Sequence, residues 1–304
     1  SDVYKRQYDE MENSENSLVE EIIAELKDIE SLKGQLENTE LKMLKSDEMN
    51  WDEKQSLKNS IDQSKKEIEK LEKIAEAIES ITEQAEKHKL LSPKMLEKFK
   101  ELSRLVNEIM PKDMMNNIDD LEMALENMDM DSIQDALSQL SEDMEKVEKD
   151  LDRYLEIFKR FQAEQKLDEI QNRLQNLIEQ QGALDNEIDR VNENPSSMDR
   201  LAQEEQRNLD EFESIQSLIE DASEMIEQFN RNTANELSKL SESELSENIM
   251  QNLSDIVQSL SNRNNQDAEA QSKESLSNMN MMMQQMMQYP MPSYTSTKRK
   301  LQHQ

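Results

Sequence analysis

The chain has 304 residues, of which 34% are hydrophobic, 4% aromatic and 34% charged, and its formal net charge is −32. With two glycines and five prolines, it has too few turn residues for a β-rich or α/β fold of this length. An acidic surface repels phosphate backbones and anionic lipid, which argues against nucleic acid and acidic membranes as partners. We expect an all-α fold with no sheet, built from elongated coiled-coil hairpins and one segment of short helices.

Residues 1–13 are expected to be disordered. The first seven residues resemble translated adaptor sequence at the end of a gene fragment, and no function is expected of them.

Residues 14–90 are predicted to form an antiparallel helical hairpin. Both helices repeat apolar residues at steps of three, four and seven, which places one stripe on one face of each helix. Asn50 and Glu53 have the spacing of a capping box, which marks the start of the second helix. The seam residues are Ile22, Ile29 and Leu36 in the first helix, and Leu57, Ile61, Ile68 and Leu71 in the second.

Two single residues of the hairpin are of interest. Trp51, the only tryptophan, falls in the first turn of the second helix, where it is expected to staple the hairpin loop or, alternatively, to contact a partner. His88 is near the end of that helix and is expected to interact with the helix dipole.

Residues 91–128 are predicted to form two short helices. The first begins at Ser92 and Pro93, with serine as the cap and proline at the first helical position. Pro111 is expected to end it. The second is expected to end near Met128.

Residues 129–193 are predicted to form the longest helix, capped by Asp129, and residues 196–262 to form returning helices. The apolar stripe changes phase after Phe161, which predicts that the buried face changes partner or that the helix kinks there. Asn194 and Pro195 are expected to end the long helix. Its seam residues include Leu140, Val147, Tyr154, Phe158 and Phe161.

Residues 263–304 are expected to be a mostly disordered, Met/Gln-rich tail. After Tyr289 the sequence turns basic and is either a native flexible tail or the product of a frame slip or truncation. Clustered methionines can form an adaptable groove for apolar helices or bind Cu(I), or they can simply belong to an amphipathic end whose continuation is missing. The possible interaction surface consists of Met279, Met282, Met283, Met286 and Met287.

Catalytic chemistry is not predicted. The chain has no cysteine, no glycine-rich phosphate loop and no histidine placed to activate a serine, and its carboxylates have the spacing of a solvated helix surface. We expect no enzyme activity, no cofactor and no metal site. No stretch approaches the length of a transmembrane helix.

Three stretches together resemble a bacterial family known as domain of unknown function 4175. They are residues 50–54 (NWDEK), 91–102 (LSPKMLEKFKEL) and 154–169 (YLEIFKRFQAEQKLDE). The resemblance spans residues 51–229 and implies the coiled-coil region of a bacterial envelope protein, with a membrane anchor upstream. It implies no catalytic residue.

Three functions are compatible with these features. The first is a non-catalytic structural or scaffolding segment that contacts protein partners, or self-associates, through its helix seams. The second is a Met-rich module that binds apolar helices or unfolded clients. The third is a Cu(I)-binding tail.

Overall fold

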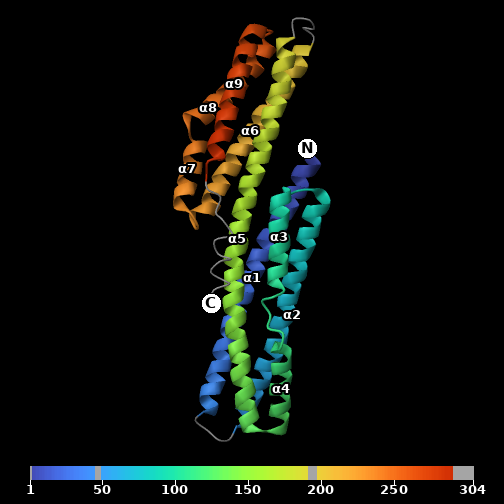
Figure 1. Cartoon of the computed structure of the whole chain (residues 1–304), viewed down its shortest axis with the longest axis vertical. Helices are drawn as coiled ribbons and strands as arrows, with labels where there is room; N and C mark the ends of the chain where they lie inside the picture. The colour runs from blue at the N-terminus through green and yellow to red at the C-terminus, as the bar shows by residue number, and fades with distance from the viewer. Residues whose placement is uncertain (1, 45–48, 191–196, 290–304) are drawn as a thin grey trace. The chain divides into compact units, whose positions relative to one another are not determined.

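A computed structural model describes residues 2–44, 49–190 and 197–289. The prediction of an all-α fold is confirmed, and the described residues contain no strand. Nine helices follow one another along these residues (Figure 1): α1 (Asp2–Met43), α2 (Trp51–His88), α3 (Pro93–Val106), α4 (Met114–Asn127), α5 (Met130–Asp189), α6 (Met198–Glu227), α7 (Arg231–Ser241), α8 (Glu244–Ser261) and α9 (Asn265–Met286).

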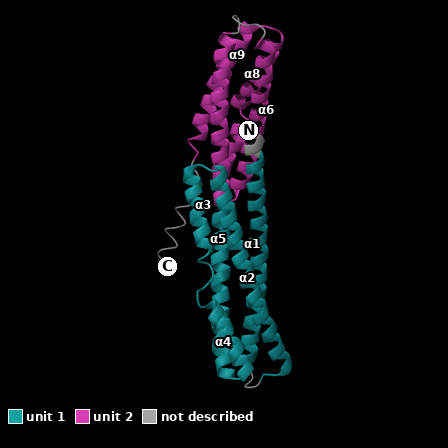
Figure 2. Ribbon diagram, turned by 90° about the vertical axis from the view of Figure 1, so that its right-hand side faces the viewer, with its two compact units in different colours: residues 1–159 teal, residues 160–304 magenta. Residues whose placement is uncertain are grey.

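The chain divides into two compact units, residues 1–159 and residues 160–304 (Figure 2). The division falls inside α5, between Lys159 and Arg160 and so close to Phe161, after which the apolar stripe changes phase. Residues 161–167 are all buried, whereas a helix with one apolar stripe buries only one face.

In the first unit, α1 and α2 pack side by side in opposite directions (Figure 1). The amide of Gln7 near the start of α1 donates to Nδ1 of His88 at the end of α2, at 3.0 Å. Lys70 of α2 reaches Asp28 farther along α1, at 2.6 Å. The order of these pairs is reversed along the two helices, so the hairpin is antiparallel.

The caps of the shorter helices follow the sequence closely. Asn50 and Glu53 form both hydrogen bonds of a capping box at the start of α2. The hydroxyl of Ser92 accepts a hydrogen bond from the amide of Met95, with Pro93 in the first turn of α3. Helix α3 and the middle of α5 are joined through the core by the rings of Phe99 and Phe158, whose centroids are 6.2 Å apart.

In the second unit, one core joins the end of α5 to α6, α7, α8 and α9. Helix α6 packs on both α7 and α8, and α8 packs on α9. The guanidinium of Arg160 lies over the ring of Phe229, 5.3 Å from its centroid, and Phe229 packs against this core.

The expected disorder at the two ends is wrong where the structure describes them. Helix α1 begins at Asp2, and Tyr8 and Met11 are buried because they extend the alternating three- and four-residue spacing of the seam. Helix α9 occupies about half of the expected tail, since methionine, glutamine and alanine are good helix formers. The residues after Tyr289 are outside the described residues.

Pro111 does not directly end α3, which stops at Val106. A proline ring clashes with the carbonyl four residues earlier, here that of Asn107, so the last helical turn before Pro111 cannot form. Ile109 in the connecting segment is nevertheless buried. Asn194 and Pro195, expected to end the long helix, lie outside the described residues.

Candidate interaction surface and buried polar clusters

Four large apolar side chains are exposed at one end of the first unit, where the end of α1, the start of α2 and the end of α4 meet (Figure 1). We call them the Trp51 surface: Leu41, Leu44, Trp51 and Met128, which are 57%, 60%, 75% and 45% exposed. The ammonium of Lys54 lies 3.2 Å from the sulfur of Met128, which ties the first turn of α2 to the end of α4.

The expectation that Trp51 staples the hairpin loop is wrong, because its side chain is three-quarters exposed. The capping box of Asn50 and Glu53 fixes this turn instead. A single exposed apolar residue is ordinary, but an indole offers more apolar area than any other side chain and is enriched at protein interfaces.

Carboxylates flank the Trp51 surface. Asp52 follows the tryptophan, and Glu126, Asp129 and Asp131 flank Met128, all of them exposed. The hydroxyl and amide of Ser132 donate to Asp129, and these hydrogen bonds lower the pKa of that carboxyl. The basic groups described beside them are Lys42 and Lys54, so the border of the surface is net negative.

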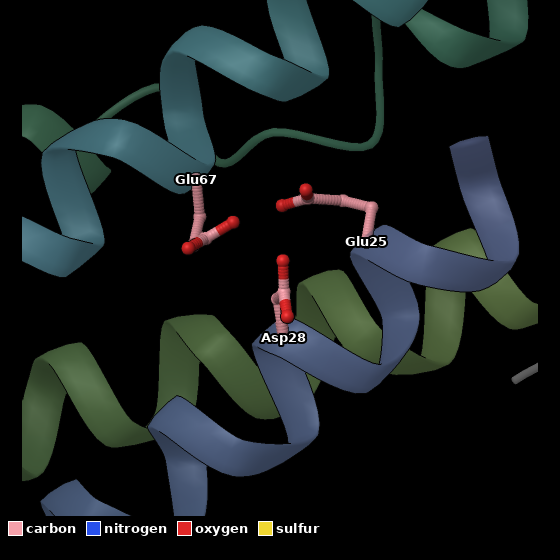
Figure 3. Close-up of side chains that lie close together, drawn as sticks. All are labelled: Glu25, Asp28 and Glu67. Carbon is pink, nitrogen blue, oxygen red and sulfur yellow. The ribbon is translucent and has the colours of Figure 1, made fainter.

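Three carboxylates converge between α1 and α2 (Figure 3). Oxygen atoms of Glu25, Asp28 and Glu67 all lie within 4.8 Å of one another, and Glu25 and Glu67 are almost completely buried. The ammonium of Lys70 lies 3.4 Å from Glu25, 2.6 Å from Asp28 and 2.7 Å from Glu67. Lys70 therefore supplies the cation that these carboxylates require.

Burial raises the pKa of Glu25 to about 8, and the hydrogen bond and negative charge of Glu67 act in the same direction. Lys70 opposes this shift. Burial alone would lower the pKa of Lys70, but its hydrogen bonds with Asp28 and Glu67 raise it above the ordinary value. At neutral pH the cluster therefore holds a neutral Glu25 beside a charged Lys70.

A second buried polar cluster lies in the core of the second unit and joins α5, α6 and α9. The amide of Gln181 donates to Glu205 at 3.3 Å and to Ser272 at 3.2 Å, and its carbonyl accepts from Asn208 at 2.8 Å. All four residues are buried. The pKa of Glu205 is raised to about 8, and burial is the largest cause. The hydrogen bond from Gln181 acts against this rise, and the negative charge of Asp185 adds to it.

Neither cluster was predicted from the sequence, although the seam spacing contains the signal. Glu25 falls three residues after Ile22 and four before Ile29, which is a seam position. Gln181 falls four residues after Leu177 and three before Leu184, which is also a seam position. The periodicity of apolar residues alone does not identify the polar residues that occupy seam positions.

The predicted methionine surface is mostly core. Met279, Met282, Met283 and Met286 are buried against the second unit, and Met287 is 67% exposed. The seam spacing of the four buried residues places them on the inner face of α9, which accounts for the difference. Thioethers in this core are not displayed to a partner.

Every predicted seam residue is buried inside this one chain. Salt bridges between helices support the packing. Lys33 of α1 pairs with Glu148 of α5, and Lys65 of α2 pairs with Glu122 of α4. In the second unit Arg173 of α5 pairs with Glu211 of α6 at 2.7 Å. The seams are therefore occupied by neighbouring helices of the same chain.

No model of a protein family matches the chain, and no curated protein or solved structure matches it either. Among the described helices, none combines the length and the apolar character needed to cross a membrane.

Proposed function

We propose that the chain is a non-catalytic scaffolding segment that contacts protein partners through surfaces outside its helix seams. The observation that carries this proposal is the Trp51 surface, where the only tryptophan is 75% exposed at the end of a helical unit. Apolar side chains gathered at one end of a soluble helical unit are typical of contact sites.

The burial of the seams modifies the predicted mode of contact. Self-association through the seams would require Ile29, Ile61 or Val147 to leave a core in which each is at most 1% exposed. Exposing a buried aliphatic side chain costs about 1.5–3 kcal/mol, and a seam contains many of them. Contacts at the helix ends require no such unpacking.

The resemblance to the domain of unknown function 4175 family favours an envelope location and an upstream anchor. Both stay predictions, because no family model matches the chain. Within the proposal, the chain is the exposed helical part of a bacterial envelope protein.

The two Met-based alternatives lose their main support in the burial of the tail methionines. A client groove or a Cu(I) site would have to rely on Met281 and Met287, which are 43% and 67% exposed. Two thioethers on a helix surface form a poor copper site, since soft ligands bind best when they surround the ion.

Site-specific photo-crosslinking in bacterial cells that express the chain tests the scaffolding proposal. A photoreactive residue replaces Trp51 in one variant and exposed Glu83, at the opposite end of α2, in a control. We expect discrete protein adducts at position 51 and none at position 83. Absence of adducts at both positions would count against a contact function.

Cu(I) titration against a competing chelator tests the copper alternative. We expect no retained metal. Stoichiometric uptake that disappears in a Met281→Ser/Met287→Ser variant would replace the proposal with the copper function.

A further inference from the structure

We infer that the Trp51 surface binds a basic amphipathic helix of a partner protein, with aliphatic side chains against the indole and lysine or arginine side chains against the carboxylate border. The inference rests on the proposed contact function and adds the chemistry of the partner. Two independent features lead to it: the exposed apolar group and the sign of the charge around it.

The apolar part of the surface comes from three helix ends. Leu41 and Leu44 are three residues apart on the last turn of α1 and just beyond it, and Trp51 opens α2. Met128 is held at the end of α4 in a left-handed conformation, with a φ of 55°, which ends the helix and turns the chain toward α5. Leucine, tryptophan and methionine together accept a range of aliphatic shapes, since a thioether adapts its packing.

The charge of the border selects the sign of the partner. Asp52, Glu126, Asp129 and Asp131 are exposed carboxylates in or next to the three helix ends. Asp129 is fixed by its bonds to Ser132, which keep its carboxyl ionised and held in place. Lys54 is already placed over Met128, which leaves Lys42 as the other basic group described at this end.

The net charge of the whole chain also favours a basic partner. The net charge of −32 attracts a basic partner from a distance and repels a second copy of the chain. A second copy would place two negative borders together, and an anionic lipid surface would meet the same repulsion. A basic amphipathic helix satisfies both the apolar and the charged part of the surface.

Trp51 makes the test direct, because the only tryptophan of the chain lies in the surface. The full chain is titrated with a helix-forming peptide of leucine and lysine, and separately with its leucine and glutamate counterpart. We expect the lysine peptide to shift the Trp51 emission to shorter wavelength, with affinity that falls as salt is added. The glutamate peptide is expected to cause no shift.

Two matched variants separate a specific surface from general attraction to an acidic protein. Asp52→Asn/Glu126→Gln/Asp129→Asn neutralises three of the four border carboxylates and keeps a capping side chain at position 129, and we expect it to weaken binding roughly tenfold. Glu76→Gln/Glu79→Gln/Glu83→Gln removes the same charge from exposed positions farther along α2. That control is expected to change affinity by less than about twofold.

Leu41→Ser/Leu44→Ser tests the apolar part and is expected to abolish the emission shift while leaving the circular dichroism melt unchanged, because both residues are exposed. Equal weakening by the two charge variants would overturn the inference. So would an emission shift that depends only on protein concentration, which identifies a second copy, or a shift on neutral lipid vesicles alone. Cross-links at position 51 without peptide binding would retain the contact function and refute the basic helix.

Discussion

Single residues in seam positions determine how these helices respond to pH. Glu25 and Glu205 are buried, and each has a pKa of about 8 because burial disfavours the ionised carboxyl. In the unfolded chain both carboxyls ionise near their ordinary value of 4.5. The folded state therefore holds protons that the unfolded state has released at neutral pH.

The first prediction concerns Glu205. Between pH 4.5 and about 8 the unfolded state loses a proton that the folded state keeps, so the free energy of unfolding falls as the pH rises. For a shift of this size the fall is on the order of 5 kcal/mol. Glu205→Gln removes this part of the pH dependence, and its melting temperature is expected to exceed that of the parent at pH 9 and to match it at pH 4.

Thermal melts followed by circular dichroism across this pH range measure the effect. Glu213→Gln is the control, because Glu213 is exposed on the same helix. If the parent and Glu205→Gln keep the same pH profile, Glu205 does not hold a proton in the folded state.

The second prediction concerns Lys70. Lys70→Gln leaves Glu25, Asp28 and Glu67 without their cation, and we expect the free energy of unfolding to fall by about 2 kcal/mol. The expected loss of free energy is smaller than for a fully buried ion pair, because the Lys70 side chain is 42% exposed. Urea denaturation measures the loss, with the exposed Lys73→Gln as control. Equal effects of the two variants would show that the cluster does not depend on Lys70.

At the scale of elements, the periodicity of apolar residues was sufficient to place most helices. The steps of three and four in α1, α2 and α5 recur because every seam residue must return to the same face. The capping box before α2 and the serine–proline start of α3 were also readable, because capping depends on local side-chain chemistry.

Helix α9 and Trp51 show why the rest could not be predicted. The inner face of α9 consists largely of serine, asparagine and methionine, and its burial comes from neighbours that are remote in sequence. The direction of the Trp51 side chain depends on the helices that meet beside it, which no local pattern specifies. The buried acids were missed because their seam positions carry polar residues.

The third prediction tests α9 as a packed element. Met279 is fully buried and Met281 is 43% exposed on the same helix. Met279→Ala is expected to lower the free energy of unfolding by about 2–4 kcal/mol, because it leaves a cavity. Met281→Ala is expected to change it by less than about 0.5 kcal/mol. Urea denaturation measures the free energy of unfolding of both variants. If both changes are small, residues 265–286 are not a packed helix.

At the scale of the whole molecule, the central claim is that the helix seams are filled within one chain. Coiled-coil patterns fit intramolecular hairpins and bundles of several chains equally well. The burial of the seam residues of both units favours the first arrangement, and the net charge of −32 opposes close association of copies. Partners are then left with surfaces outside the seams, and the Trp51 surface holds four of the eight large apolar side chains that are exposed among the described residues.

Sedimentation equilibrium of the full chain over a wide range of concentrations tests this claim most directly. Filled seams predict a single species with the chain mass of 35.7 kDa at every concentration. The Leu41→Ser/Leu44→Ser variant is expected to give the same mass, because it alters only the Trp51 surface. A dimer or trimer of the parent that persists in this variant would contradict the claim, since the seams would then join different chains.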